Sequence, residues 1–256
     1  MEIDRKRVLR VFKEYVANYD SSDEKVRLKI GHTIRVSRLC QEIADSLCLP
    51  EEEVSLAWLL GMLHDVGRFE QLKNYGTFID AQSIDHAAYG AELLFGQGRI
   101  RDYIDCGKED GLLEAAVRYH SAYRLPGEFG PRQKMFCQIL RDGDKIDILK
   151  VNVDSPLEEI YNVSREELRT CLVSGEVMEA FKEKHAIHRS LKKTPVDNVV
   201  GHISLAYELA YPRSVALIKE QGYLKKLMEF QSENPGTEEQ FRQIREAMGQ
   251  YLEGKG

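Results

Sequence analysis

The feature that most constrains the fold is the helical spacing of apolar residues along nearly the whole chain. In residues 7–19, "RVLRVFKEYVANY", valines, phenylalanine and tyrosines recur every three or four positions, which places them on one face of a helix. Residues 30–49 repeat this spacing with isoleucines and leucines. No convincing run alternates between apolar and polar residues, as a half-buried strand would. We therefore predict an all-α fold.

Local signals mark several helix starts. Pro50 precedes three glutamates, which suits the positive end of a helix dipole, and this helix runs into His64. A further helix is expected to begin near Ser83. Three later helix starts are also signalled. Ser164 with Glu167 and Thr237 with Gln240 are capping-box pairs. Thr194 with Pro195 begins a helix that is expected to run through Leu209.

The composition excludes several classes of protein. A net charge of -6 argues against a broad nucleic-acid-binding surface, so nucleic acid is an unlikely partner. The five cysteines are odd in number and form no C-x-x-C pair, which is typical of reduced thiols in a cytoplasmic protein. The first residues, "MEIDRKRVLRVF", lack an apolar signal core, and the longest apolar run, 54–63, is too short to span a bilayer. We expect a cytoplasmic protein with no membrane segment.

An expected apolar helix ends in a cluster of polar and charged residues. The stretch "AWLLGMLHDVGRFE", residues 57–70, brings His64, Asp65 and Arg68 to the end of a core helix. Three more histidines lie in or at the ends of apolar helices, and a later segment reads "RDGDKID". Burying such groups without compensation costs up to several kcal/mol each, and a bound cation offsets that cost. The pattern therefore predicts a metal site.

The order of these residues resembles the HD-domain superfamily of metal-dependent phosphohydrolases. The pattern H…HD…H…H…D occurs as His32, His64–Asp65, His86, His120 and Asp144, in the contexts "IGHTIRVSRL", "LLGMLHDVGRF", "SIDHAAYGAELL", "AVRYHSAYRLP" and "RDGDKIDIL". The resemblance spans about residues 25–150. It implies an HD-domain helical bundle with helical additions at 1–24 and 151–256, and we expect residues 1–256 to form a single domain.

The resemblance also implies a ligand set. His32, His64, Asp65 and Asp144 would hold one metal ion, and Asp65 would bridge to a second ion held by His86 and His120. Imidazole and carboxylate ligands suit Fe, Mn, Zn or Ni, so two divalent transition-metal ions are expected. The last ligand is assigned to Asp144 because "GDKI" fits the family pattern better than "RDGD". Asp142 is left as a residue that supports the ligands or lies at the surface.

Two adjacent cations lower the pKa of a bridging water, supply a hydroxide nucleophile and neutralise phosphoryl oxygens. The resemblance therefore implies hydrolysis of a phosphoester or phosphoanhydride in a nucleotide or small phosphorylated metabolite. Asp65, Arg68 and Lys145 are the expected catalytic residues, with Arg68 and Lys145 holding the substrate phosphate. The alternatives are a surface arginine that closes the helix and a solvated lysine. The loop 71–82 is expected to line the pocket.

Two other functions stay open at this point. The same ligand set occurs in diiron oxygenases of the inositol-oxygenase type, which oxygen consumption would separate from a phosphatase. A non-catalytic ligand-sensing HD module is the second alternative, although an intact ligand set argues against it. A cyclic-dinucleotide phosphodiesterase is disfavoured because no G-Y-P element follows the HD pair. A homo-oligomer is compatible with the sequence.

Three histidines lie outside this pattern. His185 and His188 are three apart on an expected helix, a spacing that can chelate a metal. The basic residues around them favour a solvated face, with contact to an anionic ligand or another subunit as an alternative. His202 lies in an apolar helix, where core packing is the favoured role and support of the metal ligands is the other.

Overall fold

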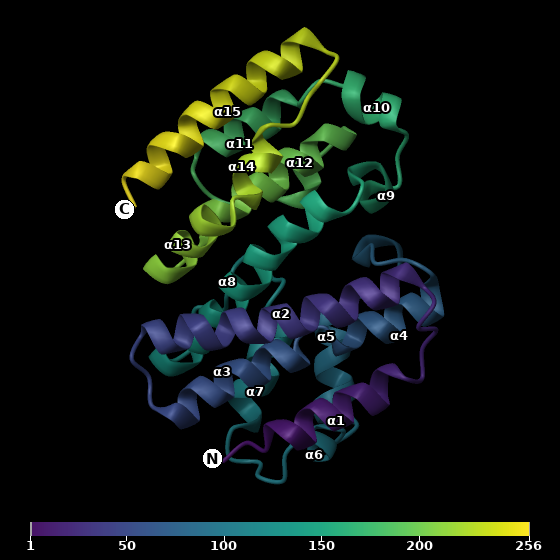
Figure 1. The fold of residues 1–256 in the computed structure, drawn as a ribbon, viewed down its shortest axis with the longest axis vertical. Coiled ribbons are helices and arrows are strands. Elements are labelled where there is room, and N and C mark those ends of the chain that lie inside the picture. The colour runs from purple at the N-terminus through teal and green to yellow at the C-terminus, as the bar shows by residue number, and fades with distance from the viewer. Residues whose placement is uncertain (1, 256) are drawn as a thin grey trace. The chain divides into compact units, whose positions relative to one another are not determined.

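The computed structural model describes residues 2–255, and its regular elements are helices throughout (Figure 1). No strand occurs between residues 2 and 255, so the predicted all-α class is confirmed. The chain divides into two compact units, Met1–Asp144 and Lys145–Gly256. The expectation of one domain across residues 1–256 stays a prediction. No helix in the described part combines the length and apolar character that a bilayer span requires.

The first unit begins with two helices whose starts are capped by aspartates: Asp4 accepts hydrogen bonds from two amides of the first turn, and Asp23 accepts one. Its elements are α1 Arg5–Val16, α2 Glu24–Ser46, α3 Glu51–Leu63, α4 Val66–Tyr75, η1 Asp80–Gln82, α5 His86–Ala91, the π-helical turn η2 Glu92–Gly96, α6 Ile100–Tyr103, α7 Asp110–Tyr119 and the first part of α8 Pro131–Asp154.

The core of this unit depends on two close helix contacts. Helices α2 and α3 pack along one another, and a Cβ atom on Gly61 would lie 2.4 Å from the Cα atom of Ser37. Helix α5 packs on α4 and α7. A Cβ atom on Gly67 would lie 2.2 Å from the carbonyl oxygen of His86, so only glycine allows this approach. These contacts bring His86 towards the junction of α3 and α4.

The starts of α3 and α5 lie at or near the positions that the sequence predicts. Pro50 is the N-cap residue of α3, as expected, and three glutamates occupy its first turn. The helix expected from near Ser83 begins at His86, because the Asp85 side chain caps α5 by accepting hydrogen bonds from the Ala87 and Ala88 amides.

The second unit is arranged around α12, which contacts α10, α11, α14 and η4. The predicted capping box at Ser164 is confirmed, as are Thr194 and Pro195 as N-cap and first residue of α12. That helix was expected through Leu209; it ends at Ser204 and continues as a 3-10 helix. The elements are the rest of α8, α9 Leu157–Tyr161, α10 Arg165–Thr170, α11 Gly175–Lys182, η3 Arg189–Leu191, α12 Pro195–Ser204, η4 Leu205–Glu208, α13 Pro212–Gln221, α14 Tyr223–Met228 and α15 Pro235–Glu253.

Two expectations for this unit are wrong. The start signal at Thr237 is not used, because Asn234 caps α15 and the Thr237 hydroxyl donates to the Cys171 carbonyl at 2.8 Å. His185 and His188 do not share a helix, because α11 ends at Lys182 and the chain then turns through Lys184 at φ 57°.

Candidate metal centre

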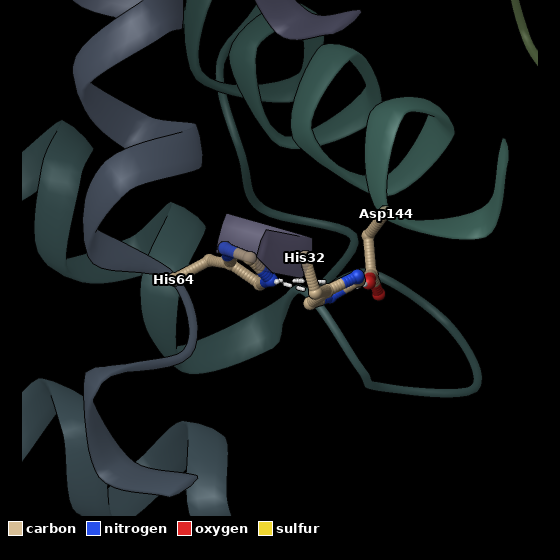
Figure 2. Close-up of side chains that lie close together, drawn as sticks. All are labelled: His32, His64 and Asp144. Carbon is tan, nitrogen blue, oxygen red and sulfur yellow. Dashed lines mark hydrogen bonds and ion pairs between the residues drawn. The ribbon is translucent and has the colours of Figure 1, made fainter. Parts of the chain in front are cut away.

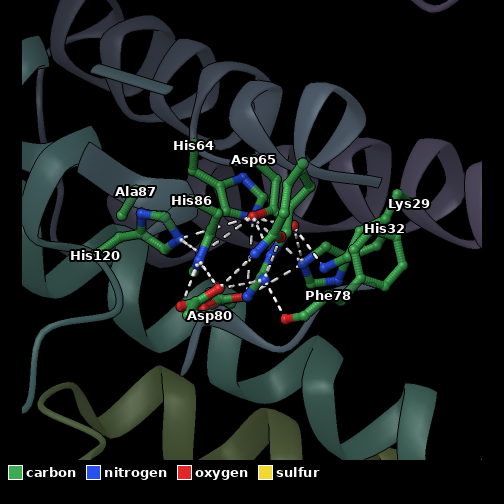
Figure 3. A network of polar contacts seen from close by, with 12 residues as sticks. Lys29, His32, His64, Asp65, Phe78, Asp80, His86, Ala87 and His120 are labelled. Atoms are coloured by element: carbon green, nitrogen blue, oxygen red, sulfur yellow. Dashed lines mark hydrogen bonds and ion pairs between the residues drawn. The ribbon is translucent and has the colours of Figure 1, made fainter. Parts of the chain in front are cut away.

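The structure brings all six predicted ligand residues of the first unit into one cluster. The histidines and Asp65 are labelled in Figure 3, and Asp144 in Figure 2. They come from separate elements and meet where these elements end or cross: His32 on α2, His64 and Asp65 between α3 and α4, His86 at the start of α5, His120 after α7, and Asp144 on α8. The four imidazoles and Asp65 are at most 3% exposed. The cluster is therefore held by the packed core and not by surface loops.

One half of the cluster contains His32, His64 and Asp144 (Figure 2). The Nε2 atom of His32 lies 3.2 Å from Nε2 of His64 and 3.2 Å from Oδ1 of Asp144. Asp65 closes this half, with its Oδ2 atom 3.5 Å from Nε2 of His32 and 3.6 Å from Nε2 of His64. The four side chains thus point donor atoms at one small volume.

The other half contains His86 and His120, whose Nε2 atoms are 3.1 Å apart. Here the second oxygen of the same carboxylate is involved: Asp65 Oδ1 lies 3.6 Å from Nε2 of His86 and 3.8 Å from Nε2 of His120. Each Asp65 oxygen therefore faces a different histidine pair. This is the arrangement that a carboxylate bridging two ions needs.

Hydrogen bonds at Nδ1 fix which imidazole nitrogen is protonated. Nδ1 of His64 and Nδ1 of His120 lie 2.8 Å and 2.7 Å from the carbonyl oxygen three residues earlier in the same helix. Nδ1 of His86 lies 2.9 Å from Oδ2 of Asp80. Because these oxygens only accept, each Nδ1 carries the hydrogen, and Nε2 of the neutral ring keeps its lone pair. Lone pairs facing each other at 3.1 Å repel unless a cation lies between them.

The charge state of the cluster suits such a cation. Burial lowers the pKa of His86 to about 4, assisted by the Arg68 charge, and burial also lowers the pKa of His120 to about 4. Burial alone would raise the pKa of Asp65, but Lys29, His64 and Arg68 outweigh it and hold that pKa well below its usual range. Neutral imidazoles and an ionised carboxylate fit divalent metal ions as ligands.

The lowered pKa values predict an acid-sensitive metal-free protein. Unfolded histidine titrates near pH 6.5, whereas His86 and His120 have a folded pKa of about 4, so the unfolded chain binds protons first. The free energy of unfolding should therefore fall as pH drops from about 6.5 towards 4, by on the order of 2 kcal/mol per histidine at pH 5. Urea unfolding of chelator-treated protein at pH 7 and pH 5 measures this fall. The double variant His86→Gln/His120→Gln should show a smaller one; an equal fall in both proteins would contradict the prediction.

Arg68 lies beside the cluster in the first turn of α4, with its side chain 13% exposed. Its Nη1 atom donates to the Phe78 carbonyl at 2.7 Å and to Asp80 Oδ1 at 2.8 Å. Its Nε atom is buried 3.7 Å from Asp65 Oδ1 and makes no hydrogen bond to any described residue. This placement does not fit a surface arginine that closes a helix. Residues 71–75 of the expected loop belong to α4, and the chain after it contacts Arg68 through Phe78 and Asp80. Its lining of a substrate pocket stays a prediction.

Asp142, Lys145 and the three histidines outside the motif are the remaining candidate site residues. Asp142 is completely buried, so the surface alternative is wrong, and its support of the metal ligands stays a prediction. Lys145 directly follows Asp144 in α8, is buried and is the first residue of the second unit. Its contact with substrate stays a prediction. Among the described residues, no potential metal-ligand group includes His185, His188 or His202.

Two residues of the cluster were missed by the sequence analysis. Lys29 places its Nζ atom 2.7 Å from Asp65 Oδ2, and its position three residues before His32 on α2 was an available signal. Asp80 accepts from both His86 and Arg68, and Figure 3 shows it beside His86. It is the first residue of the short 3-10 helix η1, six residues before His86, and this separation follows no α-helical spacing, so the sequence offered no signal for it.

The fold and the cluster define a class: a helical protein whose buried imidazoles and carboxylates are arranged for divalent metal ions. The comparison with protein families agrees, since residues 30–149 match the family model described as HD domain. Residues 30–149 therefore match an HD domain, and the resemblance seen in the sequence is confirmed over that part of the chain. HD domains bind divalent metals and form a superfamily of metal-dependent phosphohydrolases. Comparison with curated proteins and with solved structures gives no match.

Proposed function

We propose that this chain is a metal-dependent phosphohydrolase with two divalent transition-metal ions, Fe, Mn, Zn or Ni. Its proposed substrate is a nucleotide or small phosphorylated metabolite, cleaved at a phosphoester or phosphoanhydride bond. The observation that carries the proposal is the position of Asp65, whose two oxygens face two separate pairs of histidine Nε2 atoms. His32, His64 and Asp144 would hold one ion, and His86 and His120 the other.

Bound ions of this kind supply a water nucleophile at neutral pH and neutralise charge on phosphoryl oxygens. The protein's own contribution is orientation and positive charge beside Asp65. Lys29 and Arg68 approach different oxygens of that carboxylate. The buried Arg68 Nε–H has no partner among the described residues, so it is available to donate to a phosphoryl oxygen. Lys145 is proposed as a further cation for the substrate phosphate.

Replacing Arg68 with glutamine should lower kcat/KM for a phosphorylated substrate by about 10–100-fold, because a charge-assisted hydrogen bond to the phosphoryl group is lost. Metal content should stay close to that of the unaltered protein. Steady-state kinetics with metal analysis measure both values. Arg118 is a matched control on α7, since it pairs with Glu114 at a half-exposed position; Arg118→Gln should leave kcat/KM unchanged. An unchanged kcat/KM in Arg68→Gln would remove Arg68 from the proposed site.

The proposed reaction is tested by loading chelator-treated protein with Mn, Fe, Zn or Ni and screening phosphorylated nucleotides and metabolites for phosphate release. The proposal expects phosphate release that depends on added metal. Oxygen consumption is followed in parallel. Turnover that consumes oxygen without releasing phosphate would replace the proposal with the oxygenase alternative, and metal-independent phosphate release would overturn the mechanism.

We also propose that the protein works in the cytoplasm. All five cysteines are free thiols, and two of them, Cys40 and Cys137, are buried. Free thiols persist in reducing compartments, whereas oxidising ones favour disulfides.

A further inference from the structure

A second polar cluster lies in the second unit, around α9, η3 and α12. Tyr161, the last residue of α9, stacks on His202 of α12 with ring centroids 5.7 Å apart and an interplanar angle of 21°. Lys192 follows η3, and Lys192 and His202 are both half-buried. Neither residue belongs to the candidate metal centre.

The hydrogen bonds around Tyr161 determine the state of His202. Nδ2 of Asn152 donates to the Ile148 carbonyl, so Oδ1 of Asn152 accepts the Tyr161 hydroxyl hydrogen at 2.8 Å. Nδ1 of His202 lies 2.8 Å from the same hydroxyl oxygen. Since that hydroxyl has only one hydrogen, Nδ1 must donate and Nε2 keeps its lone pair. Nε2 makes no hydrogen bond to a residue between 2 and 255, so it is an acceptor in need of a donor.

Lys192 places a positive charge against Gly201, the residue before His202. A Cβ atom on Gly201 would lie 2.4 Å from both Cε and Nζ of Lys192, so the ammonium group lies directly on the backbone that precedes His202. A side chain at position 201 would displace it. Within the described chain, the ammonium group makes no ion pair or hydrogen bond.

The carboxylate that acts on Lys192 is Asp197, which makes no ion pair with it and accepts hydrogen bonds from other groups. Oδ1 of Asp197 accepts the Ser174 amide at 2.8 Å. Oδ2 of Asp197 accepts the Ser174 hydroxyl at 2.6 Å and the amides of Lys193 and Thr194 at 2.7 Å and 2.9 Å. Asp197 therefore accepts hydrogen bonds from the backbone at the start of α12, and it does not pair directly with the Lys192 ammonium group.

Arg189 is a second cation near Lys192. Arg189 lies one 3-10 turn before Lys192, whose amide donates to the Arg189 carbonyl at 3.1 Å. Burial lowers the pKa of Lys192 to about 8, and Arg189 lowers it in the same direction. Burial likewise lowers the pKa of His202 to about 3, with smaller effects from Lys192 and Arg189. The three groups are thus close enough to act on one another, and His202 stays neutral.

We propose that Lys192 and His202 form a second ligand site, for an oxyanion that also carries a hydroxyl group. The ammonium group of Lys192 would bind the anionic oxygen, with Arg189 adding long-range attraction, while Nε2 of His202 would accept the ligand hydroxyl. Hydrogen phosphate is the simplest ion with both features, and a phosphorylated polyol has them as well. Sulfate lacks the hydroxyl at neutral pH and should bind more weakly.

The test uses the full chain after chelator treatment, so that the metal centre does not contribute phosphate binding. An amine-modifying reagent is applied at pH 8, and modification of each lysine is followed by peptide mass spectrometry. Lys193 is the internal control, because it is exposed and pairs with Glu176. Lys192 should be protected at least about fivefold by millimolar phosphate and clearly less by sulfate, whereas Lys193 should respond to neither.

The variant His202→Phe should abolish the preference for phosphate over sulfate at Lys192. Protection by glycerol phosphate that exceeds protection by phosphate assigns the site to a phosphorylated polyol, and the reverse order assigns it to free phosphate. Equal protection of Lys192 by phosphate and sulfate in the unaltered protein, or no protection at all, would overturn the proposal. That result needs no variant, so it does not depend on how well His202→Phe folds.

Discussion

Replacing Asp65 with asparagine is expected to lower metal-dependent phosphate release by about a thousandfold. Bound metal should fall from about two ions per chain to at most one. The reason is that Asp65 faces both histidine pairs, with Oδ2 3.6 Å from Nε2 of His64 and Oδ1 3.6 Å from Nε2 of His86. Asparagine keeps the shape but offers one oxygen and no charge. Metal analysis after gel filtration and a phosphate-release assay measure the two effects.

Asp85 provides the matched control for this change. It is a neighbouring aspartate, but its Oδ1 atom caps α5 by accepting the Ala87 and Ala88 amides. Asparagine is an equally good N-cap residue, so Asp85→Asn should retain both metal and activity. Full metal content in Asp65→Asn, or equal losses in the two variants, would contradict the bridging role of Asp65.

Replacing Asp80 with alanine should weaken the metal site at His86 and His120 by about 10–100-fold in affinity. Asp80 accepts the His86 Nδ1 hydrogen at 2.9 Å and also accepts a hydrogen bond from Arg68 Nη1. Without this carboxylate, the imidazole of His86 loses the contact that orients Nε2 towards Asp65. Calorimetric titration of chelator-treated protein with Mn or Zn should show one weakened metal site and one unchanged metal site.

A second substitution separates orientation from charge at this position. In the variant Asp80→Asn, the side-chain amide oxygen can still accept from His86, so the affinity loss should be smaller than that of Asp80→Ala. Equal weakening of both metal sites in Asp80→Ala would mean that the change disturbs the whole cluster. Unchanged affinities would show that Asp80 does not position His86.

The sequence predicted the six clustered side chains because each one departs from an apolar helical pattern at a position that the family motif also marks. The helix ends near His64 and His120 could be located to within a few residues. Lys29 also follows from the sequence in principle, since residues three apart share a helix face. Regular helices therefore carry most of the information that places the candidate ligands.

The features that the sequence did not predict lie in irregular backbone, or where two nearby residues both suit the start of a helix. Asp80 lies in the short 3-10 helix η1, and tertiary contacts with Arg68 and Gln71 help to hold it against His86. Asn234 and Thr237 both suit an N-cap, and Pro235 at the first helical position favours Asn234. His185 lies outside a helix because the chain adopts a left-handed conformation at Lys184. None of these outcomes follows from spacing alone.

The most direct test of the proposed metal centre is anomalous diffraction from crystals of the full chain grown with Mn²⁺. We predict two anomalous peaks on either side of the Asp65 carboxylate. One should lie about 2–2.3 Å from Nε2 of His32 and His64, and the other at the same distance from Nε2 of His86 and His120. Absence of anomalous density at Asp65, or a single ion that Asp65 does not contact, would contradict the dinuclear site.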